Sequence, residues 1–299
     1  MLIDNKEIVI SGCIVKTASL KDEWYDSIED PEGFTRKMKD KNVKADIFTF
    51  WQRLNDTQSR YDYYSEEDPA AVIPVKSYEH WLNHQIDRSA RKAVRKAEKS
   101  GVFVKVVELD DRFVEGVVSI FNETPIRQGR PYRHYGMNAD AVMRELTKDK
   151  HRSDFIGAYH GEELIGFIQL GNTGISAIPF GMVSKIAHRD KAPQNALLAK
   201  AIEVCEKKNI PYLLYGKWLS DSLGDFKRHN GCVKMDLSRY YIPLSLKGVV
   251  VLRLQLHHGL ADRLPIPVKN HLKALRKKLY TGMQNKKKQE RTEESSPAS

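Results

Sequence analysis

Residues 188–204 have the sequence HRDKAPQNALLAKAIEV, in which a charged turn containing a proline leads directly into an apolar helix. We expect this helix to begin at about Pro193, because proline is well tolerated at the first helical position. His188, Arg189 and Lys191 lie just before it. Cations beside the positive end of a helix dipole cost energy unless an anion lies among them. The stretch is therefore either a solvated turn or a binding site for a phosphate-bearing ligand.

The predicted elements around this stretch alternate between strands and helices. Alternating apolar residues on both sides of the sequence HGEE predict a β-hairpin over 154–170. A strand over 175–188 leads into the charged turn, and the helix that follows it is expected over 194–208. The other elements predicted nearby are helices over 110–123, 138–149 and 222–231 and strands over 102–109, 211–218 and 234–244.

A longer helix is predicted over 77–100, with Ser77 as its N-cap and Gly101 as its stop. Basic residues recur on this helix every three or four positions, and small apolar residues form the opposite stripe. The basic residues are Arg88, Arg91, Lys92, Arg95, Lys96 and Lys99. This basic stripe is either a solvated helix face or a surface along which an RNA acceptor stem lies.

The two ends of the chain predict further short elements. The first 76 residues indicate strands over 7–16, 45–54 and 70–76 with a helix over 31–41, and these strands are interpretable as a degenerate half-copy of the later unit. Near the other end a strand is predicted over 248–256, and His257 and His258 are placed on it. Adjacent strand residues point to opposite faces, so we do not expect a joint histidine site.

Composition narrows the class of protein. The 299 residues are 41% hydrophobic and 29% charged, which is typical of a globular protein, and neither a long apolar run nor a signal pattern is present. We therefore expect a cytoplasmic protein. Its three cysteines are far apart, which argues against a disulfide framework or a zinc site.

Of the net charge of +10, residues 269–299 contribute nine Lys or Arg and three Glu, or +6. This basic tail is either a solvated end or a contact for RNA, DNA or anionic lipid.

Four passages in this order carry a resemblance to a known superfamily. They are ARKAVRKAEKSGVFV (90–104), ETPIRQGRPYRHYG (123–136), KAPQNALLAKAIEVCEKKNIPYLLYG (191–216) and DFKRHNGCVKMDLSRYY (225–241). The chain resembles the GNAT acyltransferases, and within them the Fem-type peptidoglycan aminoacyltransferases of bacteria. The resemblance implies an α/β (α+β) fold with a mixed, mostly antiparallel sheet flanked by helices. It divides the chain into a strand-rich portion (1–76), an acyltransferase domain (77–250) and a last strand with the basic tail (251–299).

The donor-binding turn departs from the superfamily pattern. GNAT proteins usually have two small residues in the loop that binds the cofactor pyrophosphate, and here Ala192 and Gln194 occupy these positions. Glycine at such positions lets backbone N–H groups approach phosphate closely, so their absence weighs against coenzyme A. The Fem-type donor is an aminoacyl-tRNA ester. The sequence therefore leaves two donors open, acyl-CoA and aminoacyl-tRNA, with no metal.

The resemblance implies attack by a substrate amine on a thioester or ester carbonyl, which needs proton transfer and oxyanion stabilisation. The candidates for proton transfer are Glu123, His134, Tyr135 and Tyr240. The oxyanion donor is expected to be a backbone N–H within Ser184, Lys185 and Ile186. The acceptor is expected to contact Arg127, Arg130 and Tyr132, because guanidinium groups bind carboxylate or phosphate. The donor is expected to contact His188, Arg189, Lys191, Asn195 and Lys227.

The sequence thus predicts a bacterial N-acyltransferase that moves an acyl or aminoacyl group to an amine of a cell-envelope or sugar-linked precursor. Its partners would include this acceptor, tRNA if the donor is an aminoacyl ester, and an anionic membrane surface through the basic tail. Two alternatives stay open. One is a catalytically silent GNAT-like module that binds a ligand or a protein, and the other is an RNA-associated protein that uses the basic helix and tail.

Overall fold

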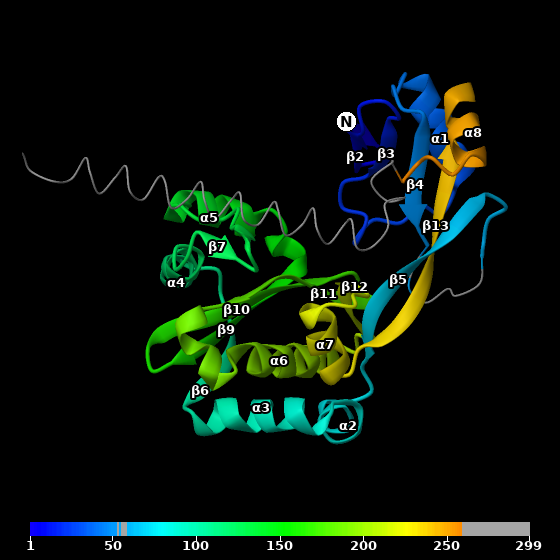
Figure 1. Ribbon diagram of the computed structural model, residues 1–299. Helices are drawn as coiled ribbons and strands as arrows, with labels where there is room; N and C mark the ends of the chain where they lie inside the picture. Colours follow the sequence, from blue (N-terminus) through cyan, green and yellow to red (C-terminus); the bar gives the residue numbers. More distant parts are fainter. Residues whose placement is uncertain (53, 55–58, 259–299) are drawn as a thin grey trace, which may run out of the picture.

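The computed structural model of the chain describes residues 1–52, 54 and 59–258 (Figure 1). Its main feature is a mixed sheet of eleven strands in the order β1-β2-β3-β4-β13-β5-β12-β11-β10-β9-β6. Two neighbouring pairs in this sheet, β3–β4 and β11–β12, are parallel, and the others are antiparallel. The predicted mixed, mostly antiparallel α/β fold is confirmed. The basic tail predicted over 269–299 lies outside the described residues.

The bounds of the elements are as follows. The strands are β1 (Leu2–Ile3), β2 (Lys6–Ser11), β3 (Thr17–Leu20), β4 (Ile47–Trp51), β5 (Tyr64–Pro74), β6 (Val102–Val107), β7 (Ile126–Arg127), β8 (Arg130–Pro131), β9 (Ser153–His160), β10 (Glu163–Asn172), β11 (Ser176–Ser184), β12 (Tyr212–Lys217) and β13 (Val233–Pro243). The α-helices are α1 (Pro31–Asp40), α2 (Tyr78–His80), α3 (Arg88–Lys99), α4 (Asp111–Phe121), α5 (Ala139–Thr147), α6 (Pro193–Lys207), α7 (Ser222–His229) and α8 (Leu246–Arg253). Short π- and 3-10 segments are η1 (Trp81–Gln85), η2 (Lys150–Arg152) and η3 (Ile186–Lys191).

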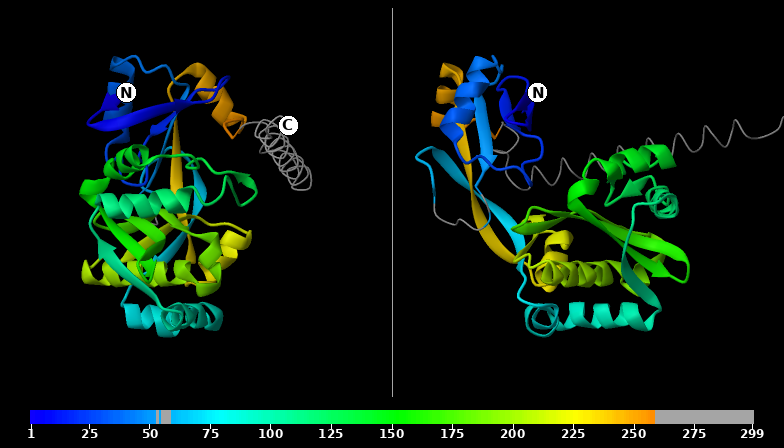
Figure 2. Two further views of the ribbon diagram at one scale, coloured as in Figure 1. Left: turned by 90° about the vertical axis from the view of Figure 1, so that its left-hand side faces the viewer. Right: turned by 180° about the vertical axis from the view of Figure 1, so that it is seen from behind.

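The strand order shows that two units exchange their last strands. Strand β5 follows β4 in the chain but pairs with β12, whereas β13 follows β12 but pairs with β4. The exchanged strands pair with each other from Tyr64 and Tyr241 to Val72 and Val233. Figures 1 and 2 show β5 and β13 as long ribbons that run from the N-terminal unit, which contains α1 and α8, to the unit that contains α6.

Helices cover both faces of the second unit's sheet. Helix α6 packs on β9, β10 and β11, and α3 packs on the outer side of α6 as a further layer (Figure 1). Ala90 and Ala97 on α3 are buried in the same core as Leu197 and Ile202 on α6, as the apolar stripe predicts. Helices α4 and α5 lie on the opposite face of the sheet. None of the helices in the described part of the chain is both long and apolar enough to cross a membrane.

The structure differs from the sequence prediction in two elements. The helix expected over 77–100 is interrupted at Ile86, whose extended backbone separates η1 from α3. The interruption has a tertiary cause: Trp81 is fully buried and its indole N–H donates to the Asn230 carbonyl at 3.0 Å, which fixes the first segment against α7. A new N-cap, Asp87, then starts α3 by accepting from the Ala90 N–H at 2.7 Å.

The second difference lies near the end of the described chain. The strand predicted over 248–256 is wrong, because Leu246–Arg253 is helix α8. Its run of valines favours a strand by local propensity. However, Ser245 caps the helix, and Val251 and Leu252 pack against Ile47 and Tyr241, so burial of one helical face outweighs that propensity.

Candidate functional site

The site is built around a divergence between two parallel strands. Strands β11 and β12 pair at Ser176–Tyr212 and Ala177–Leu213, and no further pair between them occurs in the described sheet. The remaining residues of β11, up to Ser184, pair only with β10, so the β11 edge that faces β12 is left without a strand partner. Such an edge presents backbone N–H and C=O groups to any extended group that enters the gap.

A buried lysine lies beside this divergence. Lys227 on α7 is only 4% exposed, and its Nζ donates to the Lys217 carbonyl at the end of β12 at 2.7 Å. Gly216 adopts φ +82°, and a side chain there would meet Lys227 Nζ at 3.9 Å. Burial lowers the pKa of Lys227, although Cys232 and Asp221 act in the opposite direction. An ammonium with a lowered pKa is a better proton donor than a solvated lysine.

Two further side chains line the divergence. The Tyr215 hydroxyl on β12 contacts the Met182 sulfur on β11 at 3.7 Å, which places these residues face to face across the gap. The Nζ of Lys227 lies 5.1 Å from the centroid of the Tyr215 ring. Burial raises the pKa of Tyr215, so its phenol stays protonated. Two proton donors, the ammonium of Lys227 and the phenol of Tyr215, therefore lie beside the divergence together with the thioether of Met182.

A pair of asparagines joins the helices around Lys227. The Asn195 amide on α6 donates to the Asn230 side-chain oxygen at 3.0 Å, and the Asn230 amide donates to the Phe226 carbonyl at 2.7 Å. Asn230 is 1% exposed, so both of these bonds lie in the interior. The predicted donor contact Asn195 is thus part of the framework that fixes α7, and with it Lys227, against α6.

The charged turn before α6 is occupied by a side chain of the protein itself. Both oxygens of Glu123 accept backbone N–H groups from this turn, one from Ile186 at 2.7 Å and the other from Ala187 at 2.9 Å. The Ala192 N–H donates to the Arg189 carbonyl. Pro193 has no N–H. The start of the charged segment, at Ile186 and Ala187, therefore already holds a carboxylate, just before the residues of 188–191 that are predicted to contact a donor.

Arg127 holds this carboxylate in place. Its guanidinium donates to Glu123 at 3.0 Å and to the carbonyls of Ile120 and Ser184 at 2.9 Å each. The side chains of Arg127 and Glu123 are 16% and 18% exposed, so the pair is mostly shielded from solvent. These contacts tie α4, β11 and the turn together. Arg127 and Glu123 thus lie beside the end of β11, and each already has partners within the protein.

The cations of the turn also have acidic neighbours. His188 lies 3.1 Å from Glu163, and Lys185 donates to the other oxygen of Glu163 at 2.6 Å and to Ser119 at 2.7 Å. Lys191 lies 3.7 Å from Asp190. The Lys185 N–H donates to the Ile165 carbonyl at 2.8 Å. Two of the three predicted oxyanion donors, Lys185 and Ile186, therefore already have acceptors, which leaves Ser184 of that group.

The predicted acceptor loop is a small hairpin, β7–β8, that packs beside α4. Tyr132 contacts Phe121 edge-on, and the Arg127 guanidinium lies 5.0 Å from its ring centroid. His134 stacks on Phe121 at 4.5 Å. Burial and the charge of Arg133 lower the pKa of His134, so its imidazole is neutral at pH 7. Arg130 and Tyr135 are exposed.

Tyr240 lies in a different part of the molecule. It is fully buried in the N-terminal core with Phe48 and Phe50. Its hydroxyl has partners on several sides, including the Gln52 side chain at 2.5 Å and the Arg60 N–H at 2.7 Å. The structure therefore does not bring Tyr240 together with Glu123 or Lys227, and its contacts are those of a core residue.

The basic stripe of α3 reaches the same end of the molecule as the charged turn. Arg88, Arg95 and Lys99 are exposed, whereas Arg91 is partly buried and donates to the carbonyls of Leu82 and Asn83 at 2.7 Å each. Helix α3 contacts η3, the segment that carries Arg189 and Lys191. The exposed part of the stripe and the charged turn thus form neighbouring cationic surfaces.

A separate cavity lies between the two units. Its lining includes Trp24, Trp51 and Leu237 from the N-terminal side and Ser176 and Leu214 from the second unit. Next to it, Arg239 joins Glu23 and Asp68 in an ion-pair cluster, with nearest distances of 3.0 Å to each acid. The cavity adjoins the end of β11 and β12 at which these strands are paired, so it is distinct from the divergence.

Sequence reasoning identified Lys227 but missed its surroundings. Tyr215 and Met182 are ordinary apolar strand residues by pattern, and only the geometry of β11 and β12 brings them together. The contact between Glu123 and the turn joins residues 63 positions apart. One signal was present in the sequence: Glu123 directly precedes the basic hairpin, so a carboxylate and a guanidinium four residues apart were available to pair.

The comparisons with known proteins agree with this geometry at the level of the fold. No protein-family model and no curated protein matches the sequence. The crystal structure of FemX superposes with a TM-score of 0.56 at 12% identity, over 79% of this chain and 84% of that chain. The C-terminal domain of a protein named as a lysylphosphatidylglycerol synthetase from Agrobacterium fabrum gives a TM-score of 0.54 at 11% identity, over 82% of this chain and 83% of that chain. The L-PGS from Bacillus licheniformis gives 0.52 at 14% identity, over 83% and 85%. The chain therefore shares the fold of FemX and of these two further structures.

Proposed function

We propose that this protein is an N-acyltransferase that moves an aminoacyl group from the ester of a charged tRNA to an amine. The observation that carries the proposal is the buried ammonium of Lys227 beside the divergence of β11 and β12. A charged group is rarely buried without an ionic partner unless a function requires it. Transfer from an ester produces an oxyanion and an alkoxide leaving group, and both need a positive charge or a proton donor.

Lys227 and Tyr215 supply these requirements. The ammonium of Lys227, which keeps one bond to the Lys217 carbonyl, has further N–H groups to donate to an oxygen of the substrate. Its lowered pKa favours transfer of a proton to the leaving oxygen. Among residues 1–52, 54 and 59–258, the Tyr215 phenol has only the Met182 sulfur as a weak acceptor, so it can turn to donate to the developing oxyanion. In this mechanism Lys227 is the general acid and Tyr215 an oxyanion donor.

The occupied turn argues for an aminoacyl ester over acyl-CoA. Coenzyme A bound in the GNAT manner needs backbone N–H groups of the turn over 189–194, but Pro193 has none and the Ala192 N–H already donates to the Arg189 carbonyl. A bound pyrophosphate there would also lie against the negative charge of Glu123. A tRNA donor instead requires an extended cationic surface, and the exposed residues of α3 next to Arg189 and Lys191 provide one. The name lysylphosphatidylglycerol synthetase among the solved structures fits an aminoacyl donor.

The acceptor is proposed to be an amine-bearing cell-envelope precursor with an anionic group, bound at the β7–β8 hairpin. Arg130 is exposed there and offers a guanidinium for a carboxylate or phosphate. His134 lies in the same hairpin, and its neutral imidazole is the proposed proton acceptor once the attacking amine replaces Arg133, whose Nε donates to His134 Nε2 at 2.8 Å. Transfer to the amine of an envelope precursor keeps the predicted acceptor class.

The test compares two lysine variants of the full chain. Transfer is measured from bulk tRNA charged with radiolabelled amino acids to a UDP-linked muramyl peptide, and separately to aminophospholipid vesicles. We expect Lys227→Met to lower transfer at least about 100-fold, as loss of a transition-state donor does. Lys234→Met, at an exposed lysine on β13, is expected to leave it unchanged.

Thermal shifts check the donor independently. We expect charged tRNA to raise the Tm and acetyl-CoA to leave it unchanged, because only the former has a free binding surface. Transfer from acetyl-CoA, or equal transfer by Lys227→Met and the unmodified protein, would contradict the proposal.

A further inference from the structure

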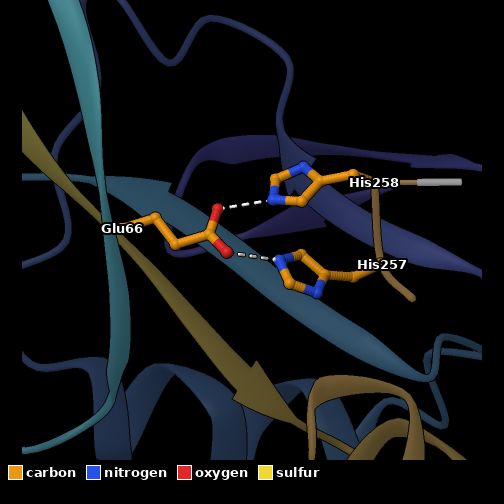
Figure 3. A group of neighbouring side chains, drawn as sticks. All are labelled: Glu66, His257 and His258. Carbon is orange, nitrogen blue, oxygen red and sulfur yellow. Dashed lines mark hydrogen bonds and ion pairs between the residues drawn. The ribbon is translucent and has the colours of Figure 1, made fainter. Parts of the chain in front are cut away.

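Three residues of metal-binding types, Glu66, His257 and His258, converge at the end of the described chain (Figure 3). His257 Nε2 lies 3.0 Å from one oxygen of Glu66, and His258 Nε2 lies 2.5 Å from the other. Glu66 belongs to β5, whereas the histidines follow α8 and are separated from it by about 190 residues of chain. The expectation that these histidines lie on a strand and point apart is wrong.

A helix ending explains how neighbouring histidines reach one carboxylate. Gln255 adopts a left-handed φ of +52°, its N–H donates to the Leu252 carbonyl, and the Leu256 N–H donates to the Val251 carbonyl. These bonds end α8 and reverse the chain. Because the segment that follows is not a strand, His257 and His258 are free to point toward the same side, and their rings lie 4.1 Å apart.

The spacing of the three groups suits one small cation. Their ligand atoms all lie within 4.8 Å of one another. In a tetrahedral site with bonds of about 2.0–2.1 Å, ligand atoms lie about 3.3 Å apart, so the observed N–O distances of 3.0 and 2.5 Å need to lengthen by less than about 1 Å to admit the ion. Imidazole nitrogen and carboxylate oxygen are the ligands that Zn²⁺ and similar borderline ions take in proteins.

The surroundings hold the groups in position. His257 has a side chain only 2% exposed, and the rings of Tyr64 and Tyr241 contact it edge-on. The Tyr64 hydroxyl donates to Glu66 at 2.7 Å, an outer bond of the kind that orients a metal-ligating carboxylate. His258 is 45% exposed and opens the group to solvent.

We propose that Glu66, His257 and His258 form a binding site for a divalent transition-metal ion of the zinc type, with water completing the coordination on the exposed side of His258. Such an ion would join β5 to the segment after α8. That segment leads directly to the part of the sequence in which Lys and Arg are concentrated. The site is far along the chain from Lys227 and does not depend on the proposed transfer.

The experiment uses the full chain without an affinity tag, stripped of metal by a chelator and titrated with Zn²⁺ and with Co²⁺. We expect one equivalent to bind, a Tm that rises with Zn²⁺, and the visible absorption of Co²⁺ in a tetrahedral N/O site. His258→Ala removes a half-exposed ligand and is expected to weaken binding at least about 10-fold while the protein stays folded. Glu66→Gln is expected to do the same at nearly constant volume.

A second histidine pair supplies the matched control. His80 and His84 lie on neighbouring helical turns with rings 5.3 Å apart, and their double substitution by alanine is expected to leave the affinity unchanged. Equal Zn²⁺ affinity in His258→Ala and the unmodified protein overturns the proposal. So does loss of binding in the His80/His84 variant, or a stripped protein that takes up neither ion.

Discussion

The two parallel strand pairs of the sheet are alike in topology and unlike in detail. Strands β3 and β4 are joined through α1, and β11 and β12 are joined through α6. In the first pair, β3 has four residues and three of them, Thr17 to Ser19, pair with β4. In the second, β11 has nine residues and only two of them pair with β12. We call β3–β4 the closed pair, because most of β3 pairs with β4, and β11–β12 the open pair, because most of β11 does not pair with β12.

This difference in pairing is matched by a difference in the side chains that lie beside each pair. Beside the closed pair the space is filled by aromatic rings: Phe34, Phe48 and Phe50 stack in sequence at 5.3 and 5.6 Å. Beside the open pair lie a buried ammonium, a phenol and a thioether, on Lys227, Tyr215 and Met182. The space beside the closed pair is thus filled by packing, whereas polar groups lie beside the open pair.

The largest expected effect tests whether the closed pair serves stability alone. Phe48 is fully buried, so Phe48→Ala is expected to lower the free energy of unfolding by about 3–5 kcal/mol, measured with urea. Transfer per folded molecule is expected to stay unchanged. Phe103→Ala is the matched control, because Phe103 is 47% exposed and its loss should cost much less. Loss of transfer in folded Phe48→Ala would place chemistry in the closed pair.

A smaller effect is expected where Glu123 fills the turn next to the open pair. Glu123→Ala leaves the Arg127 guanidinium and two N–H groups without their acceptor, and we expect a loss of about 3 kcal/mol in the free energy of unfolding. Acetate or sulfate should then bind in the vacated space and restore part of the Tm, with no such effect on the unmodified protein.

Glu162→Ala is the control for this prediction. Glu162 is 94% exposed in its ion pair with Arg112, so its removal is expected to be nearly neutral. Absence of anion rescue in folded Glu123→Ala would show that the Glu123 carboxylate does not fill an anion site, and it would contradict this prediction.

The smallest effect concerns the junction of the two units. Burial alone would raise the pKa of Asp68, but the hydrogen bond from Arg239 and the charge of Lys217 outweigh it, so the pKa lies below its usual range. Asp68 therefore stabilises the fold at a pH above its ordinary value of about 3.9, and this contribution is lost as the pH falls through the lower folded value. Asp68→Asn is expected to cost about 1–2 kcal/mol at pH 7.

The measurement is urea unfolding of Asp68→Asn and the unmodified protein between pH 7 and pH 3. The difference in unfolding free energy should shrink toward acid pH. A difference that stays constant over this range would mean that the charge of Asp68 does not join the units.

Several elements could be predicted from the sequence because their signals are local. Pro193 marks the start of α6, Asp110 caps α4, and the turn at Gly161 separates β9 from β10. Lys227 was singled out by the resemblance of its passage, 225–241, to the Fem-type proteins, and the structure places it beside the open strand pair. The valine run of α8 misled the prediction, because a short apolar run fits either a strand or a buried helix and only its packing partners decide.

By itself, the sequence determined the order of most helices and strands between β6 and β13, the α/β class and the cationic character of α3 and of the turn before α6. These depend on caps, periodicity and charge within a few residues. Only the tertiary structure decided which strands pair and which side chains meet. It exchanged β5 and β13 between the units, brought Glu123 to the amides of Ile186 and Ala187, and joined Glu66 to His257 and His258. Such contacts link residues far apart in the chain, and burial of one face of each element selects them, which no local pattern specifies.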